Sequence, residues 1–384
     1  MIGKKYWIVY LIFSIIIVLA MVGGNWDTTL AQGTVPTTPP PPPAPAAPAA
    51  VAPAPGVRPI ITAGIGHTCA ITPTDGLRCW GLNDSGQLGD ETFNNSSIPV
   101  NVVDVVVSDV IDLESGIKHT CALSSGGEVM CWGLNTSGQL GNGSITNSNV
   151  PVLVKGLVGK VVSISGGAEF TCAVNDVDEV MCWGNNSVGQ LNDSTTTNRN
   201  VATIVDPEIV NNVVMISGGQ KELQGVTSDG VANIWNSEPV IPVTGLPNEN
   251  NVLLSADRFF EGGCITSIDR VVRCWGAIVD AEVTDGVLDS DLLDTGGGHA
   301  CTVNDSGLVC WGENNHGQLG VGSEVSSEKA LPVEGITSVV DLAAGLNHTC
   351  AIIGTDTIKC WGENTYGQLG DGSTSDKTLP VVVK

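Results

Sequence analysis

The sequence predicts an all-β protein that folds as a seven-bladed β-propeller, and three observations support this prediction. The segment CAIIGTDTIKCWGENTYGQLGDG, at residues 350–372, recurs along the chain in related copies. Within each copy, two short apolar runs flank a turn, which is typical of a β-hairpin. Seven tryptophans, one per copy, repeat at a spacing that indicates a ring of similar blades.

The copies differ in how much of the motif they keep. Complete copies begin at Cys69, Cys121, Cys172, Cys301 and Cys350. The copy at Cys264 lacks the Gly-Gln-Leu segment. The seventh copy is found by aligning Ser217-Gly-Gly with Ser165-Gly-Gly, which puts Gln224 and Ile234 at the two cysteine positions. Successive copies then start 52, 51, 52, 40, 37 and 49 residues apart, so we expect blades 4 and 5 to be smaller at the rim. The marker tryptophans are Trp80, Trp132, Trp183, Trp235, Trp275, Trp311 and Trp361.

The repeated motif also resembles a known family. The pattern GxxHTCAL…GxVxCWGxNxxGQLGxG is similar to the regulator-of-chromosome-condensation (RCC1) repeat, and it covers roughly residues 60–383. The resemblance implies a seven-bladed propeller over residues 60–384. Copy 4 lacks both cysteines and the Gly-Gln-Leu segment, and copy 5 lacks the latter. Family binding sites on those two blades are therefore not implied.

The charge balance limits the classes of partner. The chain has 16 lysines and arginines against 40 aspartates and glutamates, which gives a formal net charge of −24. Nucleic-acid binding depends on clustered basic side chains that neutralise phosphates. We therefore expect no nucleic-acid partner, whatever the family name suggests.

The N-terminal residues 1–31 predict an export signal or a membrane anchor. Lys4 and Lys5 precede an apolar run at residues 6–22, and Thr29-Leu-Ala offers a small-residue cleavage site. The run is long for a signal peptide and short for a membrane-spanning helix, so both alternatives stay open. In either case the ring is exported, and it is either secreted or anchored at the cell surface through residues 6–22.

Residues 32–59 form a Pro/Ala-rich linker before the repeats. Pro39 to Pro43 are consecutive, and such a run favours an extended polyproline II conformation. The linker is either a semi-rigid stalk that holds the ring away from a surface or a spacer with no further role.

The twelve cysteines predict six disulfides, each inside one blade. In six copies one cysteine stands on each side of the hairpin turn, and copy 4 lacks both cysteines. Facing residues of adjacent strands are close enough for a disulfide, whereas the CxxC spacing typical of zinc or redox sites is missing. The predicted pairs are Cys69–Cys79, Cys121–Cys131, Cys172–Cys182, Cys264–Cys274, Cys301–Cys310 and Cys350–Cys360.

Four histidines occupy one repeat position: His67, His119, His299 and His348. Equivalent residues on different blades are expected to lie too far apart to share a metal ion. We therefore expect each histidine to bond the loop backbone of its own blade, with no metal centre. The Gly-Gln-Leu loops have no following helix to bind phosphate, and no catalytic constellation stands out. We expect no cofactor and no enzymatic activity.

These observations predict a monomeric ring that acts as an extracellular protein-interaction scaffold. Three alternatives remain: a glycan-binding propeller, an enzyme with a site at the channel mouth, and guanine-nucleotide exchange as in the founding member of the family. Fold alone does not choose among them. An exported ring cannot meet a cytosolic GTPase, which makes the last alternative the weakest.

The predicted partner site is a set of acids in the hairpin turns. Together they would form a negative ring on one face, which would attract a basic protein or peptide. The alternative is that aspartate is there because it bonds the turn's own backbone. Whether the turns also bind Ca²⁺ or other cations stays open. The residues are Asp75, Glu128, Asp178, Asp229, Asp269, Asp305 and Asp356.

Overall fold

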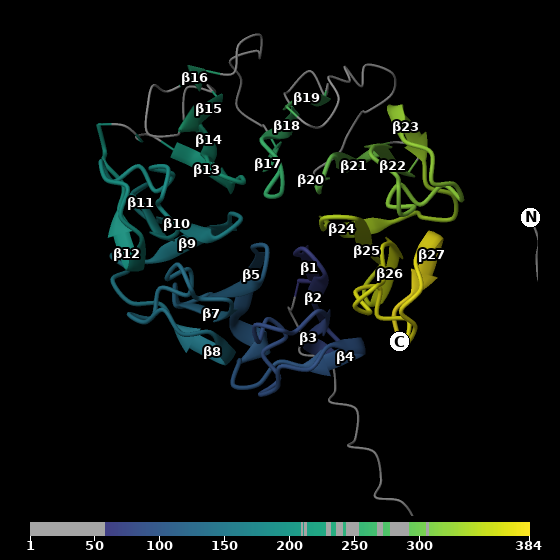
Figure 1. Cartoon of the computed structure of the whole chain (residues 1–384), viewed down its shortest axis with the longest axis horizontal. Coiled ribbons are helices and arrows are strands. Elements are labelled where there is room, and N and C mark those ends of the chain that lie inside the picture. The colour runs from purple at the N-terminus through teal and green to yellow at the C-terminus, as the bar shows by residue number, and fades with distance from the viewer. Residues whose placement is uncertain are drawn as a thin grey trace, which may run out of the picture. The chain divides into compact units, whose positions relative to one another are not determined.

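The computed structural model describes residues 58–208, 210, 213–227, 232–235, 241–242, 253–266, 272–276, 292–304 and 307–384. Seven antiparallel sheets in this part of the chain are arranged as blades around a central axis (Figure 1). The prediction of an all-β, seven-bladed propeller is confirmed. The predicted signal or anchor at 1–31, and the linker up to residue 57, lie outside the described residues. Among the residues that are described, no helix is long and apolar enough to cross a membrane.

Blades 1 to 3 each contain four strands, which follow one another in chain order from the axis to the rim. Blade 1 consists of β1 (Ile60–Ala63), β2 (His67–Thr72), β3 (Gly76–Gly81) and β4 (Ser96–Asn101). Blade 2 follows a short 3-10 helix, η1 (Val107–Asp109), and consists of β5 (Val110–Ser115), β6 (His119–Ser124), β7 (Val129–Gly133) and β8 (Ser148–Leu153). Blade 3 consists of β9 (Val161–Gly166), β10 (Phe170–Asn175), β11 (Val180–Gly184) and β12 (Arg199–Ile204).

The remaining blades follow the same order, but the described parts of blades 4 and 5 are smaller. Blade 4 consists of β13 (Val213–Gly218), β14 (Leu223–Thr227), β15 (Ala232–Trp235) and the two-residue β16 (Ile241–Pro242). Within the described ranges, blade 5 has three strands: β17 (Leu253–Ala256), β18 (Gly262–Thr266) and β19 (Val272–Gly276). Blade 6 consists of β20 (Leu293–Thr295), β21 (His299–Asn304), β22 (Gly307–Gly312) and β23 (Ser327–Pro332). Blade 7 consists of β24 (Val339–Ala344), β25 (His348–Ile353), β26 (Thr357–Gly362) and β27 (Lys377–Val382).

The paired cysteines face each other across the second and third strands of their blades. Cys69 is opposite Cys79, for example, and the same register holds in the other five cysteine-bearing blades. All six predicted disulfides are present, which confirms the predicted pairing. The sulfurs lie in the core between neighbouring blades, so each disulfide is also part of the hydrophobic packing.

The glycine after each repeated tryptophan is required by the backbone. Gly81, which follows Trp80, has a φ of 101°, a conformation that side chains rarely adopt. A Cβ at this position would also come within 2.3 Å of the carbonyl oxygen of Gly66. The Trp-Gly pair therefore ends the third strand and brings it close to the first turn of the blade.

The ring closes between blades 7 and 1. The backbone N–H of Ile61 in β1 donates to Oδ2 of Asp341 in β24 at 2.7 Å. Trp80 of blade 1 packs in one cluster with Ala343 and Ile352 of blade 7. The first and last strands of the repeat region therefore lie in adjoining blades, as predicted from their sequences (Figure 1).

The outer strands carry prolines that limit pairing with other chains. A proline cannot donate to a β-ladder, so it blunts an exposed sheet edge. This placement is consistent with a ring that stays monomeric, although the oligomeric state remains a prediction. The prolines concerned are Pro99 in β4, Pro151 in β8, Pro332 in β23 and Pro380 in β27.

Reduction of the disulfides is expected to weaken the ring without unfolding it. By the chain-entropy argument, closing a loop of this size contributes about 2–3 kcal/mol per disulfide. The buried tryptophan, valine and leucine core persists after reduction. Thermal melts with and without dithiothreitol should show a lower Tm, with the β-sheet circular dichroism retained at 25 °C. Loss of that signal at 25 °C on reduction would contradict this expectation.

Candidate functional site

The two faces of the ring are built from different loops. One face, here called the turn face, carries the hairpin turns between the second and third strands and the connections between blades. Backbone bonds join these segments, as between Ser125 and Asp109 at 2.6 Å and between Asp176 and Lys160 at 2.8 Å. The other face, here called the loop face, carries the turn between the first two strands and the Gly-Gln-Leu loops. Leu82 donates to Gly66 on that face at 2.7 Å.

Four blade junctions share one polar contact, which spans from a histidine to the next blade. The histidine Nε2 lies 2.9–3.0 Å from a threonine hydroxyl of the following blade. That hydroxyl donates its single proton to the backbone carbonyl oxygen of the glutamine in a Gly-Gln-Leu loop. This loop belongs to the same blade as the histidine. The histidine must therefore donate to the hydroxyl from Nε2. The pairs are His67–Thr120, His119–Thr171, His299–Thr349 and His348–Thr68.

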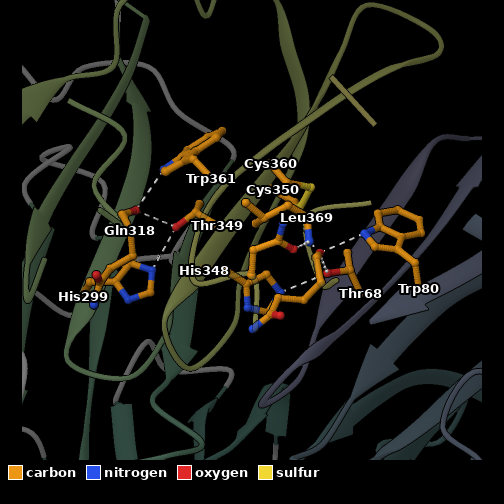
Figure 2. The surroundings of a disulfide bond; sticks show 12 residues. Thr68, Trp80, His299, Gln318, His348, Thr349, Cys350, Cys360, Trp361 and Leu369 are labelled. Atoms are coloured by element: carbon orange, nitrogen blue, oxygen red, sulfur yellow. Dashed lines mark hydrogen bonds between the residues drawn. A yellow bond between two sulfur atoms is a disulfide. The ribbon is translucent and has the colours of Figure 1, made fainter. Parts of the chain in front are cut away.

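The repeated tryptophan completes this inter-blade contact. Its indole N–H donates to the same glutamine carbonyl at 2.9 Å, as from Trp361 to Gln318 and from Trp80 to Gln368. The neighbouring leucine of the loop is buried against the same tryptophan, as Leu369 is against Trp80. Figure 2 shows two successive contacts on either side of the disulfide in blade 7. The Gly-Gln-Leu segment is thus the part of one blade that docks on the next.

The expectation that these histidines bond their own blade's loop is wrong. Each imidazole lies at a junction and bonds the next blade, because the start of the second strand faces that blade. Desolvation by burial lowers the pKa of His67, His119 and His348 to about 3 and that of His299 to about 4. The histidines are therefore neutral structural donors at physiological pH.

The residue pair at this contact changes as a unit along the chain. Where Phe170 replaces the histidine of blade 3, Leu223 replaces the threonine of blade 4, and both are buried in one apolar cluster. Gly262 of blade 5 faces a blade whose threonine position is Ala300. A histidine is thus found only where the next copy supplies the threonine. This covariation was visible in the sequence, but only to a comparison offset by one repeat.

A buried asparagine organises each Gly-Gln-Leu loop, and sequence reasoning missed it. In blade 1, Asn83 accepts from the backbone of Leu88 at 2.9 Å and donates to the carbonyl of Thr92 at 3.1 Å. The same side chain recurs at Asn135, Asn186, Asn314 and Asn364, all fully buried. Its signal in the sequence was the invariable asparagine three residues before Gly-Gln-Leu in the complete copies.

Acceptor side chains on the inner strands bridge neighbouring blades around the channel. Each one accepts a backbone N–H from the first strand of the following blade, which would otherwise be left unpaired. Serines do this in blades 3 to 5, and aspartates do it in blades 2, 6 and 7. The bonds are Ile164 to Asp112, Gly218 to Ser165, Ala256 to Ser217, Thr295 to Ser255, Ala344 to Asp294 and Ile61 to Asp341, at 2.7–3.3 Å.

Burial shifts the pKa of the channel carboxylates upward. Desolvation raises the pKa of Glu114 to about 8, against the opposing charge of Arg258. It raises the pKa of Asp341 to about 7, against the hydrogen bond from Ile61. It also raises the pKa of Asp112. These acids were missed from the sequence, although a charge within an apolar first strand was the signal.

Arg258 crosses the channel from blade 5 to blades 1 and 2. Its Nη1 donates to the carbonyl of Ser115 at 2.6 Å and to that of Ala63 at 3.3 Å, at the loop-face ends of β5 and β1. Its Nη2 lies 3.9 Å from Oε2 of Glu114. The arginine therefore links blade 5 to blades 1 and 2 near the loop face.

A cavity of about 300 Å³ lies in the channel, and Arg258 is one of the residues that line it. Its lining runs from the turn-face ends of the inner strands, at Arg58 and Ile111, to Arg258. Among the described residues, no three histidine, cysteine, aspartate or glutamate side chains gather as a metal site would require.

The described acids of the hairpin turns are displayed on the turn face. Asp75, Glu128 and Asp178 are exposed, and Asp356 is half-buried. Asp75 and Asp356 border one small surface cavity of about 60 Å³. Asp229, Asp269 and Asp305 lie outside the described residues, so the complete predicted ring stays a prediction.

Other side chains cap these turns. Thr72 Oγ1 accepts from the backbone of Asp75 at 3.1 Å, and Ser124 Oγ accepts from that of Glu128 at 3.0 Å. Asn175 Oδ1 accepts from Glu179, beside Asp178. In these three turns the acid is therefore not the capping group, which leaves its carboxylate to solvent, or to Arg78 at 3.6 Å in the case of Asp75.

Comparison with known protein families identifies the repeat. Two models of the "Regulator of chromosome condensation (RCC1) repeat" match the chain, one at residues 78–123, 126–174, 306–352 and 360–384. The other matches residues 60–87, 110–139, 161–190 and 339–368. Both leave blades 4 and 5 unmatched, where the inter-blade motif is incomplete.

The following proteins are similar to this chain at low sequence identity. The human E3 ubiquitin-protein ligase HERC2 is 27% identical over 299 residues, which cover 76% of this chain and 6% of the ligase. The ultraviolet-B receptor UVR8 of Arabidopsis thaliana is 26% identical over 359 residues, covering 85% of this chain and 81% of the receptor. The solved ectodomain of the Physcomitrella patens receptor kinase CR4 has a TM-score of 0.51 at 19% identity, covering 79% of this chain and 73% of the ectodomain. This structural likeness shows the fold alone.

A paired substitution is expected to test the inter-blade contact. His119→Phe alone should cost about 1–3 kcal/mol, because the junction loses its hydrogen bond and keeps a polar threonine against an aromatic ring. Adding Thr171→Leu recreates the Phe170–Leu223 pair and should recover most of that loss, because Trp183 still donates to the carbonyl of Gln139. Chemical denaturation of the single and double variants measures both effects. A double variant no more stable than the single one would contradict this reading.

The same double variant should change the pH dependence of stability. A histidine whose folded pKa is lowered contributes stability that is present above pH 6.5 and is lost as the pH falls toward about 3. Without His119, the double variant should therefore gain about 2 kcal/mol on the wild type between about pH 7 and pH 4.5. Parallel denaturation curves at both pH values, with a constant difference, would show that His119 is not the cause.

Arg258→Met is expected to destabilise the ring by about 3 kcal/mol, because two buried carbonyls and Glu114 lose their partner. Arg258→Lys should recover part of this loss, since an ammonium group can still donate to one carbonyl. Thermal melts compare the variants. Equal Tm values for wild type and Arg258→Met would show that the arginine does not hold blade 5 in place.

Proposed function

The chain belongs to the regulator of chromosome condensation (RCC1) repeat family, and from that premise we propose that it is an extracellular, non-enzymatic protein-interaction scaffold for a basic protein or peptide. The propeller fold by itself supports the general role of a protein-interaction scaffold, without naming the partner. The observation that carries the finer proposal is the exposure of Asp75, Glu128 and Asp178 in equivalent turns that other side chains cap.

Charge supports a basic partner. The chain carries a formal net charge of −24, and a negative surface of this kind steers cations toward it and raises their association rates. Asp178 also has a φ of 63°, a conformation that aspartate tolerates, so its position in the turn has a backbone reason as well. Glu128 has no such reason, which favours a role for its charge.

Export is supported by the cysteines. All twelve cysteines are paired in disulfides, and such bonds persist in oxidising compartments. The signal-like residues 1–31 agree with this location, whether the ring is released or anchored.

A non-enzymatic role is supported by the duties of the polar residues. The four repeated histidines would be the first candidates for proton transfer, yet they are buried, have low pKa values and bond threonine. The ligase activity in the name of HERC2 belongs to a protein of which this chain covers 6%. Glycan binding through the repeated tryptophans is disfavoured, because Trp80, Trp132, Trp183, Trp311 and Trp361 are fully buried.

The turn acids can be tested with an octalysine peptide. Glu128→Gln combined with Asp178→Asn should slow association several-fold at low salt and much less at about 0.15 M salt, because screening acts over about 8–10 Å. Stopped-flow fluorescence with labelled peptide measures the rates.

The matched control removes two charges from the loop face through Glu313→Gln and Glu324→Gln, both exposed in the chain. This control removes as many negative charges as the turn-face substitutions do, and it should leave the association rate close to that of the wild type. Equal slowing by both pairs would mean that net charge alone acts, and no slowing by the turn pair would remove these acids from the site.

A further inference from the structure

The turn face of blades 2 and 3 carries five exposed apolar side chains, here called the apolar patch. They come from the connections that lead into these blades, from the first strands, and from the hairpin turn of blade 3. Each is between 47% and 65% exposed. Single apolar side chains are common on protein surfaces, whereas a contiguous group of them marks an interaction surface. The residues are Val106, Ile111, Val158, Val162 and Val177.

Contacts between neighbouring segments make the patch continuous. The connection before blade 2 bonds the hairpin turn of that blade, where the backbone N–H of Ser125 donates to the carbonyl of Asp109 at 2.6 Å. Gly127 of the same turn lies against the connection before blade 3. That connection in turn bonds the hairpin of blade 3, where Nδ2 of Asn175 donates to the carbonyl of Val158 at 3.0 Å. The connections and turns therefore form one surface across the two blades.

Ile111 and Val162 belong to the patch because of a repeated backbone irregularity. In β5 and β9 the pairing with the second strand shifts by one residue, which leaves these two residues without a cross-strand partner. A β-bulge of this kind re-aims the side chain of the extra residue. The two strands are neighbours, since the backbone N–H of Ile164 donates to Oδ2 of Asp112 at 3.3 Å. Both side chains therefore lie at the channel side of the patch, in adjacent strands.

The patch is not a consequence of the fold, because blade 7 has no equivalent of it at three of these positions. When the bulges and turns of the blades are aligned, Gly335 takes the place of Val106 and Thr355 takes the place of Val177. Val340, which occupies the bulge of β24, is half-buried. The exposed apolar surface is thus specific to blades 2 and 3.

Acids surround the patch and indicate the chemistry of its occupant. The segments that bear it, residues 104–112, 125–128, 157–162 and 176–179, contain a single cation, Lys160. Six of their acids are exposed. A surface that is both apolar and negative is complementary to a segment with apolar and basic side chains, whereas it would be repelled by an anionic membrane. The exposed acids are Asp104, Asp109, Glu128, Asp176, Asp178 and Glu179.

We propose that the apolar patch docks a segment of a partner protein in which lysine or arginine residues are interspersed with large apolar residues. This inference rests on the proposed function and adds the place and the sequence pattern of recognition. The acids attract the segment over a distance, and the patch holds it by removing apolar surface from water. Salt screens the first contribution and not the second, so the complex persists at physiological salt.

The test compares two acetylated, amidated octapeptides: octalysine, and a peptide of alternating leucine and lysine. At about 0.15 M salt, the wild type should bind the leucine–lysine peptide about tenfold more tightly, because apolar burial outweighs the loss of screened charge. Val106→Ser with Val177→Ser, the patch pair, should abolish this preference. Phe93→Ser with Ile145→Ser removes apolar side chains of similar exposure from the loops that follow Gly-Gln-Leu, and it should keep the preference. Isothermal titration calorimetry measures the affinities.

The turn acids separate this inference from the proposed function. Glu128→Gln with Asp178→Asn should slow association of both peptides and leave the dissociation rate of the leucine–lysine peptide nearly unchanged, as stopped-flow fluorescence would show. Equal wild-type affinities for the two peptides, or a preference that the patch pair retains, would overturn this inference. Slowed association in the variant without the turn acids would then leave the proposed function standing. A wild-type ring that binds neither peptide would overturn both.

A second variant keeps the test valid if the patch pair fails to fold. Ile111→Ser with Val162→Ser changes the two residues at the bulges and should reduce the preference in the same way. Other occupants of the patch would give other results. A wild-type ring that dimerises in analytical ultracentrifugation, or that binds phosphatidylcholine vesicles, with either property lost in the patch variants, would assign the patch to a second copy or to a membrane and overturn this inference.

Discussion

At four of its junctions the ring depends on one backbone carbonyl oxygen, that of the glutamine in the Gly-Gln-Leu loop. It accepts from the threonine and the tryptophan of the next blade, and the histidine of its own blade completes the contact. Neighbouring blades share few backbone bonds, so buried polar groups at the junction must be matched by side chains. This requirement explains why Cys, Trp, Gly, Gln and Leu recur together: the disulfide and Trp-Gly shape the hairpin, and Gly-Gln-Leu reaches the next one.

Where the motif decays, other groups hold the ring. Phe170 and Leu223 turn the third junction apolar. At the junction of blades 5 and 6, Asp257 accepts from Gly298 at 3.2 Å, and Ser255 accepts from Thr295 at 3.1 Å. In the described residues, Trp275 and Trp311 have no partner for their indole N–H, which fits the missing Gly-Gln-Leu loops of the blades before them. Arg258 then bonds this weaker half of the ring to blades 1 and 2 across the channel.

Acidic residues have opposite roles depending on their place in the blade. Aspartates on the inner strands are buried, bond backbone N–H groups and have raised pKa values, as Asp341 does. Acids in the hairpin turns, such as Glu128, are exposed, and other side chains cap those turns. Only the second kind gives the turn face a field that reaches into solvent, whereas the first kind bonds neighbouring blades to one another around the channel.

The sequence by itself determined the repeat number, the hairpins and the six disulfides, because these rest on short-range spacing: Cys69 faces Cys79 through a turn that lies between them in the chain. It did not determine where the histidines bond, since His348 meets Thr68 only after the ring closes and puts the last blade beside the first. The channel cavity was likewise beyond the sequence. Arg258, Glu114 and Asp341 stand in different repeats, and only the circular arrangement of the inner strands brings them to one channel. Local pairing follows from residues near in the chain, whereas contacts between blades follow from closure.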